Sequence, residues 1–264
     1  MRPRIERTEG RRLFGSDPAA YDRARPGHAE RVYEVLAERC GLREGARVLE
    51  VGPGTGQATR RLLEGGASVV AVEPDPALAA YLEDELAVDV RVVTLEDAEL
   101  PPGELDLAVG ASCFHWVDEA VGLARIFAAL RPGGWLGLWW TLFGDAEAPD
   151  AFITATSPLL EGLDRSPTRG QEGRPPYARD SEARLAALDA AGFEDASYEV
   201  ARWEAHWDTA GIRALYGTFS PIARLDESRR TEILDGVALI AEEQFGGRVE
   251  RTLLTALYTA RRPA

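Results

Sequence analysis

The chain has 264 residues, of which 45% are hydrophobic and 28% are charged, and its formal net charge at pH 7 is −14. This length is enough to bury a full core, and the excess of acids argues against nucleic acid as a partner, because phosphate recognition needs clustered basic side chains. No apolar run is long enough to span a membrane and the basic residues 1–12 lack the apolar stretch of a secretory signal, so we expect a cytoplasmic protein with no membrane partner.

The cysteines and the basic residues further limit the kind of protein that this chain can be. Cys40 and Cys113 lie in apolar sequence and form neither a disulfide framework nor a metal-binding pattern. No cluster of His, Cys and acidic residues has the spacing of metal ligands, so we expect no metal. Every basic residue is an arginine, which is typical of a GC-rich bacterial genome.

Hydrophobic spacing predicts alternating helices and strands over the first 141 residues. In chain order, the expected elements are helix 32–40, strand 46–51, helix 57–63, strand 69–73, helix 76–86, strand 90–93, strand 105–109, helix 120–130, a turn at 131–134 and strand 135–141. Strands that alternate with helices at this pitch predict an α/β fold with a parallel, doubly wound sheet.

The rhythm changes after residue 144. Residues 145–180 are rich in proline, glycine and charge, which predicts a long loop or a partly helical insertion, of the kind that forms lids. The remaining sequence predicts helix 181–191, strand 197–207, helices 209–216 and 226–243, and strand 251–259.

A glycine-rich turn follows the first predicted strand. Residues 49–57 read Leu-Glu-Val-Gly-Pro-Gly-Thr-Gly-Gln, and residues 69–74 read Val-Val-Ala-Val-Glu-Pro. Glycines let the backbone approach a ligand without a Cβ atom in the way. Glu73, at the tip of the second strand, is placed to accept hydrogen bonds from a ribose diol. This βαβ unit predicts a nucleotide-sized site at the carboxyl ends of its strands.

The glycine spacing distinguishes between cofactors. A dinucleotide fingerprint reads G-x-G-x-x-G, and counting from Gly52 its third glycine would fall at Gln57. The observed pattern is E-x-G-x-G-x-G, which begins at Glu50. It resembles the first motif of class I methyltransferases that depend on S-adenosyl-L-methionine (SAM), whose ligand has no phosphate. The alternatives are a nicotinamide-dependent oxidoreductase, a non-catalytic SAM-binding protein, or a tight turn in another α/β protein.

The resemblance extends from about residue 14 to residue 141. Residues 21–27, Tyr-Asp-Arg-Ala-Arg-Pro-Gly, resemble an N-terminal element of bacterial small-molecule methyltransferases, including relatives of trans-aconitate methyltransferase. The resemblance implies a Rossmann-like, mostly parallel seven-stranded sheet with an antiparallel last strand and a helical N-terminal cap. It also implies one domain, divided into an arm and cap (1–30), a SAM-binding core (31–144), a lid or insertion (145–180), and the rest of the sheet with a helical substrate-side insertion (181–264).

Three segments are implied to contact the cofactor. Residues 95–101 resemble the family's adenine segment, with Asp97 as the first choice for the acid that binds the exocyclic amine and Glu96 as the second. Residues 111–118 resemble the segment whose backbone passes the methionine part. The full set of implied contacts is Glu50, Gly52, Pro53, Gly54, Thr55, Gly56, Gln57, Glu73, Pro74, Glu96, Asp97, Ala98, Ala111 and Ser112.

The acceptor side is less defined. The candidates are Tyr21, Arg25, His28, His115, Trp116 and Trp140. His115 follows the fourth strand, where open α/β sheets bind ligands, and an imidazole there is either a general base or a wall residue that bonds the backbone. Arg25 is expected to pair with a carboxylate of the cofactor or of an acidic substrate, or to form a surface salt bridge.

These residues together predict metal-independent, in-line methyl transfer to a small-molecule substrate, with His115 and Tyr21 as the catalytic candidates. S-adenosyl-L-homocysteine (SAH) would be the product of the cofactor. Arg25 and His115 favour methylation of an oxygen, on a carboxylate or a phenol, over nitrogen or carbon. We expect a monomer or a homodimer.

Overall fold

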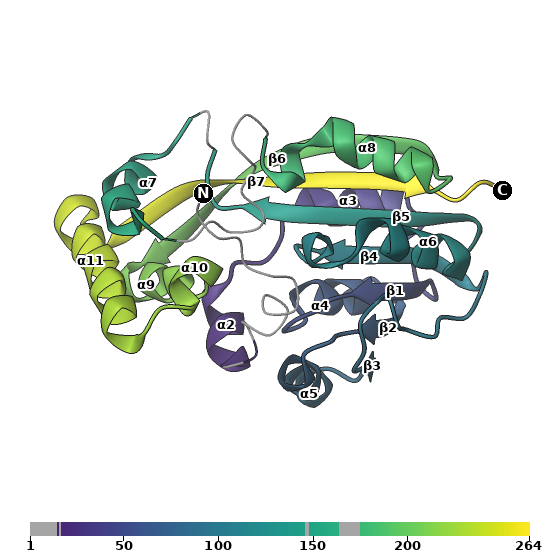
Figure 1. The fold of residues 1–264 in the computed structure, drawn as a ribbon, viewed down its shortest axis with the longest axis horizontal. Coiled ribbons are helices and arrows are strands. Elements are labelled where there is room, and N and C mark those ends of the chain that lie inside the picture. The colour runs from purple at the N-terminus through teal and green to yellow at the C-terminus, as the bar shows by residue number, and fades with distance from the viewer. Residues whose placement is uncertain (1–14, 16, 146–147, 164–174) are drawn as a thin grey trace.

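The structure is a computed structural model that describes residues 15, 17–145, 148–163 and 175–264. Figure 1 shows a central sheet with helices on both sides and a further group of helices beyond one end of the sheet. The predicted N-terminal arm (residues 1–12) and much of the predicted insertion, residues 146–147 and 164–174, lie outside the described residues.

The sheet has seven strands in the order β3-β2-β1-β4-β5-β7-β6. Strands β1 to β5 pair in parallel, and β7 runs antiparallel to both of its neighbours, β5 and β6. The predicted fold class, including the antiparallel last strand, is therefore confirmed. The strands are β1 Arg47–Val51, β2 Ser68–Val72, β3 Asp89–Arg91, β4 Leu105–Ala111, β5 Leu130–Leu142, β6 Glu194–Asp208 and β7 Arg248–Arg261.

Both faces of the sheet are covered, because successive strand residues point to opposite sides. Val48 packs with one group of helices, α3 (Glu30–Glu38) and α4 (Gln57–Glu64), and its neighbour Leu49 packs with the opposite group. That second group contains α6 (Glu119–Ala129) and α8 (Ser181–Ala190), while α5 (Pro76–Glu85) covers β2 and β3. Apolar residues on both faces explain why the parallel strands read as near-continuous hydrophobic runs.

Aspartates begin several of these helices. The Asp75 carboxylate accepts a hydrogen bond from the Ala77 N–H at 2.9 Å, and Pro76 occupies the first turn, as the sequence predicts. Asp118 caps α6 in the same way. Asp75 follows closely on β2, so its cap fixes where the chain turns from the sheet into α5, and Asp118 begins α6 after the 3₁₀ turn that follows β4.

A second helical group lies beyond the carboxyl ends of the parallel strands, at the left of Figure 1. It consists of α2 (Pro18–Ala24), α7 (Ala151–Thr156), α9 (Thr209–Gly217), α10 (Ser220–Ala223) and α11 (Glu227–Phe245). Their apolar side chains, apart from those of α2, form a separate cluster that includes Phe152, Tyr216 and Val237. Strands β5, β6 and β7, with 13, 15 and 14 residues, are long enough to reach from the main sheet to this group.

The last strand holds both sides of the predicted insertion. Arg251 on β7, whose side chain is 1% exposed, pairs with Asp150 at 3.1 Å and donates to the Phe143 carbonyl at 2.7 Å. Further along β7, the Tyr258 hydroxyl donates to the Ala178 carbonyl at 2.8 Å. The described part of the insertion is partly helical, with α7 and 3₁₀ turns at Ser157–Leu160 and Tyr177–Arg179.

The structure differs from the sequence prediction at several boundaries. Residues 131–134, predicted as a turn before a strand, form an irregularity within β5, because Leu105 pairs with Leu130 while Leu107 pairs with Trp135. Strands β6 and β7 are each longer than predicted, since they pair along most of their length. Helix α10, four residues long, was not predicted.

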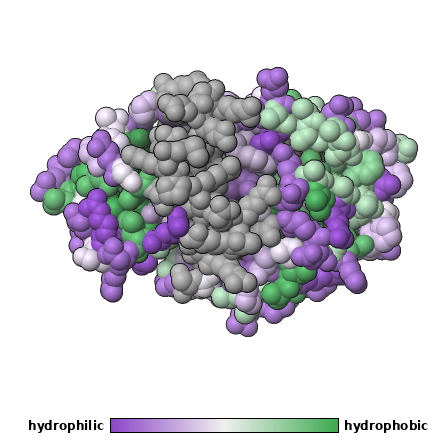
Figure 2. All heavy atoms as spheres, in the orientation of Figure 1, coloured by the Kyte–Doolittle hydropathy of each residue, from purple (hydrophilic) through white to green (hydrophobic). Residues whose placement is uncertain are grey.

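The surface is mixed in character. Figure 2 shows hydrophilic residues interspersed with smaller hydrophobic groups on the face that includes α8 and α11. Over the part of the chain that the structure describes, no helix has the length and apolar character needed to cross a bilayer.

Candidate active site

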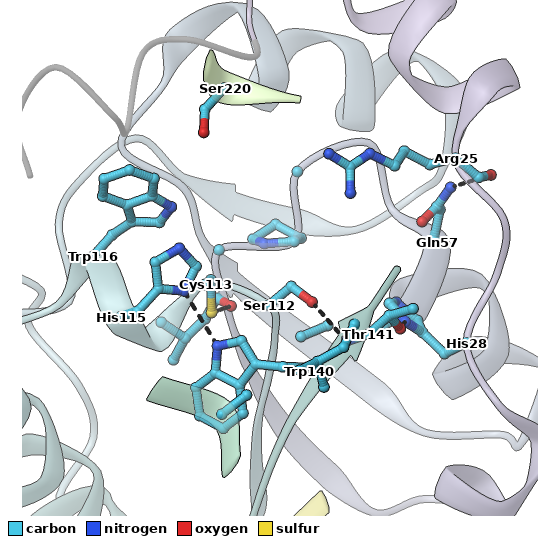
Figure 3. Close-up of a pocket in the computed structure, with 18 of the residues that line it drawn as sticks. Arg25, His28, Gln57, Ser112, Cys113, His115, Trp116, Trp140, Thr141 and Ser220 are labelled. Carbon is cyan, nitrogen blue, oxygen red and sulfur yellow. Dashed lines mark hydrogen bonds between the residues drawn. The ribbon is translucent and has the colours of Figure 1, made fainter. Parts of the chain in front are cut away.

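A cavity of about 780 Å³ opens where the parallel strands end (Figure 3). Val51 of β1, Val72 of β2 and Ala111 of β4 form its floor, and residues from α2, from the end of β5 and from α10 complete its walls. The predicted site residues that line it are Tyr21, Arg25, His28, Gly52, Pro53, Gly54, Thr55, Gln57, Glu73, Pro74, Glu96, Ala111, Ser112, His115, Trp116 and Trp140. Four predicted residues, Glu50, Gly56, Asp97 and Ala98, are not part of this lining.

The glycines of the turn serve different purposes. Gly52 has a φ of +58°, and a Cβ atom there would lie 2.7 Å from the Cβ of Cys113. Gly54 has nearly the same φ of +59°, but nothing lies within 4 Å of its Cβ position. At Gly56 a Cβ atom would meet Leu82 of α5 at 2.5 Å. Gly52 and Gly56 therefore allow close packing within the protein, and Gly54 is the glycine that leaves open space beside the cavity.

The Glu73 carboxylate, directly after β2, bonds the backbone of the glycine turn. One carboxylate oxygen accepts from the Gly54 N–H at 3.1 Å and the other accepts from the Asp75 N–H at 3.0 Å. Each carboxylate oxygen has two lone pairs, so both oxygens retain acceptor capacity for a ribose diol. The side chain is 4% exposed, and burial raises the pKa of Glu73 to about 7, although the two backbone N–H groups oppose the rise.

Glu50, the first letter of the motif, lies behind the turn. It points to the face of the sheet that α3 and α4 cover, and it is 1% exposed. Among the described residues, neither of its carboxylate oxygens has a hydrogen-bond partner. The Thr59 hydroxyl on α4 lies near the carboxylate but outside hydrogen-bonding geometry. Burial raises the pKa of Glu50 to about 7. Glu50 is thus a buried carboxyl group in the layer beneath the cavity.

The adenine segment favours Glu96 over Asp97. Glu96 lines the cavity, and its carboxylate accepts from the Asp118 N–H at 2.9 Å. Asp97 is exposed and accepts from the Thr94 hydroxyl at 2.7 Å. Ala98 is buried, and its carbonyl accepts from Arg125 at 3.1 Å. Of the two acids that the sequence offers, only Glu96 therefore faces the cavity.

The segment after β4 is held in an unusual backbone conformation. Ser112 has a φ of +51°, in the left-handed region that non-glycine residues seldom adopt. Its N–H donates to the Trp139 carbonyl at 2.7 Å, and its hydroxyl accepts from the Thr141 N–H at 3.3 Å. The Cys113 thiol donates to the Val51 carbonyl at 2.9 Å. These bonds hold the segment between β1 and β5 and position the 3₁₀ turn Phe114–Trp116 at the cavity wall.

That turn presents His115 to an aromatic wall. The Trp140 indole N–H donates to Nδ1 of His115 at 3.2 Å (Figure 3). The imidazole lies 4.7 Å from the Trp116 ring and 6.2 Å from the Tyr177 ring, centroid to centroid. Tyr177 was not among the predicted residues, because it follows the least regular part of the sequence. Its hydroxyl donates to Glu119 at 2.8 Å, which ties the insertion to α6.

Arg25 lies on the opposite side of the cavity. Its guanidinium donates to the hydroxyl and the carbonyl of Thr218, at 2.8 and 3.1 Å. It lies 5.0, 4.9 and 5.4 Å from the ring centroids of Tyr21, Phe143 and Phe219. Its backbone carbonyl accepts from Gln57, which links α2 to the glycine turn. Within the described ranges the guanidinium contacts no carboxylate, so the expected surface salt bridge does not form there.

His28 is neutral near pH 7. Burial, assisted by the positive charge of Arg25, lowers the pKa of His28 to about 4, and its Nδ1 lies 3.4 Å from the Thr141 hydroxyl. Over the described residues, no group of three or more His, Cys, Asp or Glu side chains could hold a metal ion. Arg25 is therefore the cation that this wall offers to an anionic ligand.

Comparisons with known proteins agree with this geometry. Residues 49–138 match the family model described as a methyltransferase domain. An uncharacterized methyltransferase of Mycobacterium tuberculosis is 38% identical over 48% of this chain and 51% of its own, so this chain matches about half the length of that relative. An uncharacterized methyltransferase of Schizosaccharomyces pombe is 26% identical over 94% of this chain and 96% of its own. The trans-aconitate 2-methyltransferase of M. tuberculosis is 30% identical over 65% of this chain and 61% of its own.

Solved structures share the fold. A proposed type II methyltransferase from Anaeromyxobacter dehalogenans has a TM-score of 0.64 and 22% identity, over 90% of this chain and 98% of that one. A phosphoethanolamine N-methyltransferase of Haemonchus contortus, solved with phosphomonomethylethanolamine and SAH, has a TM-score of 0.57 and 16% identity, over 98% of this chain and 61% of that one. The sheet, the glycine turn and Glu73 agree with these matches: residues 49–138 match a methyltransferase domain, and the chain is similar to SAM-dependent methyltransferases in sequence and in fold.

Proposed function

We propose that this protein methylates an oxygen atom of a small anionic molecule. The observation that carries the proposal is that Glu73 and the glycine turn share one cavity with Arg25, whose guanidinium contacts no carboxylate among the described residues. One side suits the cofactor and the other suits an anion. A volume of about 780 Å³ is large for a single small ligand and supports the binding of two.

The residues on the cofactor side fit SAM. The two oxygens of Glu73 retain acceptor capacity for the ribose hydroxyls, Gly54 leaves open space, and Glu96 offers a carboxylate on the adenine side. When bound, SAM would supply a methyl group on a sulfonium sulfur. The bond between the methyl carbon and sulfur would break, and its electron pair would stay on sulfur. The work of the protein is to orient the acceptor, exclude water and supply charge where it is needed.

The acceptor side supports an anionic acceptor. A guanidinium presents a planar set of donors that matches a carboxylate. Nε and Nη2 of Arg25 both donate to Thr218, so the protein holds the guanidinium in place. The relative that methylates trans-aconitate acts on a polycarboxylate by name, which makes trans-aconitate the first acceptor to test. Phe219 adds apolar surface beside this cation, and Trp116 and Trp140 add it on the opposite wall.

Two measurements test the proposal. Calorimetric titration with SAH is expected to show binding at one site. Incubation with methyl-labelled SAM and trans-aconitate is then expected to give a labelled methyl ester that extracts into organic solvent. An absence of SAH binding would overturn the proposal. SAH binding with no transfer to trans-aconitate or to a panel of other carboxylates and phenols would favour a non-catalytic SAM-binding protein instead.

A nicotinamide-dependent oxidoreductase is the competing enzyme class. Gln57 opens α4 at the position of the third glycine of the dinucleotide fingerprint, and its side chain donates to the Arg25 carbonyl. The side chain therefore occupies the place where a pyrophosphate would approach the helix. Mixing the protein with NADH and following the fluorescence of the nicotinamide is expected to give no change.

A further inference from the structure

The hydrogen bond between Trp140 and His115 determines which nitrogen of the imidazole carries the hydrogen. The Trp140 indole N–H points at Nδ1 of His115 across 3.2 Å, in a part of the protein where both side chains are buried. An indole nitrogen is a donor only, so Nδ1 must be the acceptor. In a neutral imidazole, one nitrogen accepts and the other carries the hydrogen, which places the hydrogen on Nε2.

Trp140 is held firmly enough to impose this choice. It belongs to β5, where it pairs with Ala256 of β7, and it is 2% exposed. Two tyrosine rings pack edge-on against it, Tyr177 at 5.4 Å and Tyr258 at 6.0 Å. A buried indole N–H without an acceptor costs free energy, so a rearrangement that breaks this bond is opposed.

The second ring nitrogen points away from Trp140, toward the part of the cavity that Trp116 and Ser220 line (Figure 3). We propose that Trp140 holds His115 as an Nε2–H donor, so that His115 positions the acceptor oxygen by a hydrogen bond and does not remove a proton from it. This inference rests on the proposed methyl transfer. It changes the role that the sequence suggested for His115, from general base to hydrogen-bond donor and positioning residue.

The remaining candidates for a base on this wall are poorly suited to the task. The Cys113 thiol donates to the Val51 carbonyl, and burial raises its pKa. Tyr177 donates to Glu119, and burial raises the pKa of its hydroxyl as well. His28 has a pKa of about 4, far from the neutral range in which a general base works best.

Because these three groups are poor bases, the inference favours an acceptor that arrives already deprotonated. A carboxylate oxygen forms the new bond to the methyl carbon with one of its own lone pairs, and no proton has to leave. A phenol would have to lose a proton to a base while the same bond forms. The pair of an Nε2–H donor on one wall and the Arg25 guanidinium on the other accordingly assigns the acceptor to the carboxylates, with a neutral methyl ester as the product.

Nitrogen NMR of the histidine side chains tests the tautomer without any acceptor. The chain has three histidines, so a sample labelled with ¹⁵N-histidine gives few signals, and His115→Gln identifies those of His115. The expected result at neutral pH is a pyridine-like Nδ1 and a pyrrole-like Nε2, and a Trp140→Phe variant is expected to show both tautomers. A pyrrole-like Nδ1 in the native protein would overturn the inference. Calorimetry with SAH on the same samples reports separately on the proposed function.

Two variants of His115 test its role in methyl transfer to trans-aconitate. A glutamine side chain places an amide N–H near the position of Nε2 but cannot act as a base, whereas asparagine reaches only to the position of Nδ1. The inference predicts that His115→Gln keeps the rate within about tenfold and that His115→Asn loses substantially more. Removal of a general base typically costs a factor of about 10² to 10⁴. Equal losses of that size in both variants, with SAH binding intact, would overturn the donor role.

Discussion

The two halves of the cavity are built in different ways. The cofactor half comes from the ends of β1, β2 and β4 and the turns that follow them, and most of its shape is set by the backbone. The acceptor half gathers side chains from α2, the end of β5, the insertion and α10, which are far apart in the sequence. The first half is therefore a property of the parallel sheet, and the second depends on how distant segments dock against it.

The difference is also one of chemistry. In the cofactor half the key contacts are backbone N–H groups with a buried carboxylate, as at Glu73. In the acceptor half they are side chains stacked on one another, as at Arg25 and Trp140. Changes in the first half should alter SAM binding and folding, and changes in the second should alter the acceptor alone.

Replacement of Glu73 by alanine is expected to have the largest effect. It removes the acceptor for both ribose hydroxyls together with the two backbone N–H contacts, and hydrogen bonds to a charged group contribute about 1.5 to 3 kcal/mol each. SAH affinity should fall more than about 100-fold by calorimetry. Glu73→Gln is the matched control, since it keeps the shape and removes the charge. Unchanged binding in the alanine variant would remove Glu73 from the cofactor site.

Gly52→Ala and Gly54→Ala form a matched pair for the turn. Their φ angles are nearly equal, so both variants carry the left-handed strain of about 1 to 2 kcal/mol. Only Gly52→Ala adds a collision with Cys113, for which overpacking costs about 1 to 3 kcal/mol more. The free energy of unfolding in urea should therefore fall further for Gly52→Ala. Equal losses in the free energy of unfolding would mean that the Cys113 segment moves aside without destabilising the protein.

Arg25→Gln is expected to affect only the acceptor half. Loss of a charged donor pair should raise the KM for a carboxylate acceptor by about 10- to 100-fold and leave the SAH affinity unchanged. Arg25→Lys keeps the charge without the planar donor set, so its KM should lie between that of the unchanged protein and that of Arg25→Gln. If SAH binding falls instead, the guanidinium pairs with the carboxylate of the cofactor, and Arg25 belongs to the cofactor half of the cavity.

The change in SAH affinity over a single pH unit is the smallest of these effects. Glu73 binds hydroxyl groups best when ionised, and burial raises its pKa to about 7. SAH affinity should rise by about tenfold per pH unit as the pH approaches 7 from below, and should level off above it. In the absence of ligand the sign is opposite, because the folded state holds a proton that the unfolded state has released, so stability falls between about pH 4.5 and 7. Calorimetry of Glu73→Gln should give a flat profile.

Local patterns allowed most of the cofactor half to be predicted from the sequence. The strand, the glycines and the acid at Glu73 lie within 25 residues, and each has a local signal in the sequence. The sequence pattern placed Asp97 before Glu96, whereas Glu96 is the one that lines the cavity, since neighbouring loop residues face opposite ways according to turns such as the one that Thr94 forms with Asp97. The position of Glu50 beneath the cavity follows from strand alternation and was in principle predictable.

The acceptor half exposes the limit of sequence reasoning. Arg25, His115 and Trp140 could be named as candidates, but their partners could not. Thr218 and Tyr177 lie in segments with no distinctive pattern. Thr218 follows β6 and α9, and Tyr177 is held near Trp140 where the neighbouring Ala178 carbonyl accepts from Tyr258 of β7. Whether Nε2 of His115 donates or accepts a hydrogen bond depends on a single indole N–H that approaches from another strand.

The ion pair of the buried Arg251 with Asp150 has a consequence for how the protein is made. Arg251 and Tyr258, on the last strand, hold the chain on both sides of the insertion. A ribosome delivers the chain from its N-terminus, so the segment with the glycine turn and Glu73 emerges long before β7 does. The binding place for the acceptor can therefore take shape only after β7 has been made, and a chain cut short before residue 251 would lack these anchors.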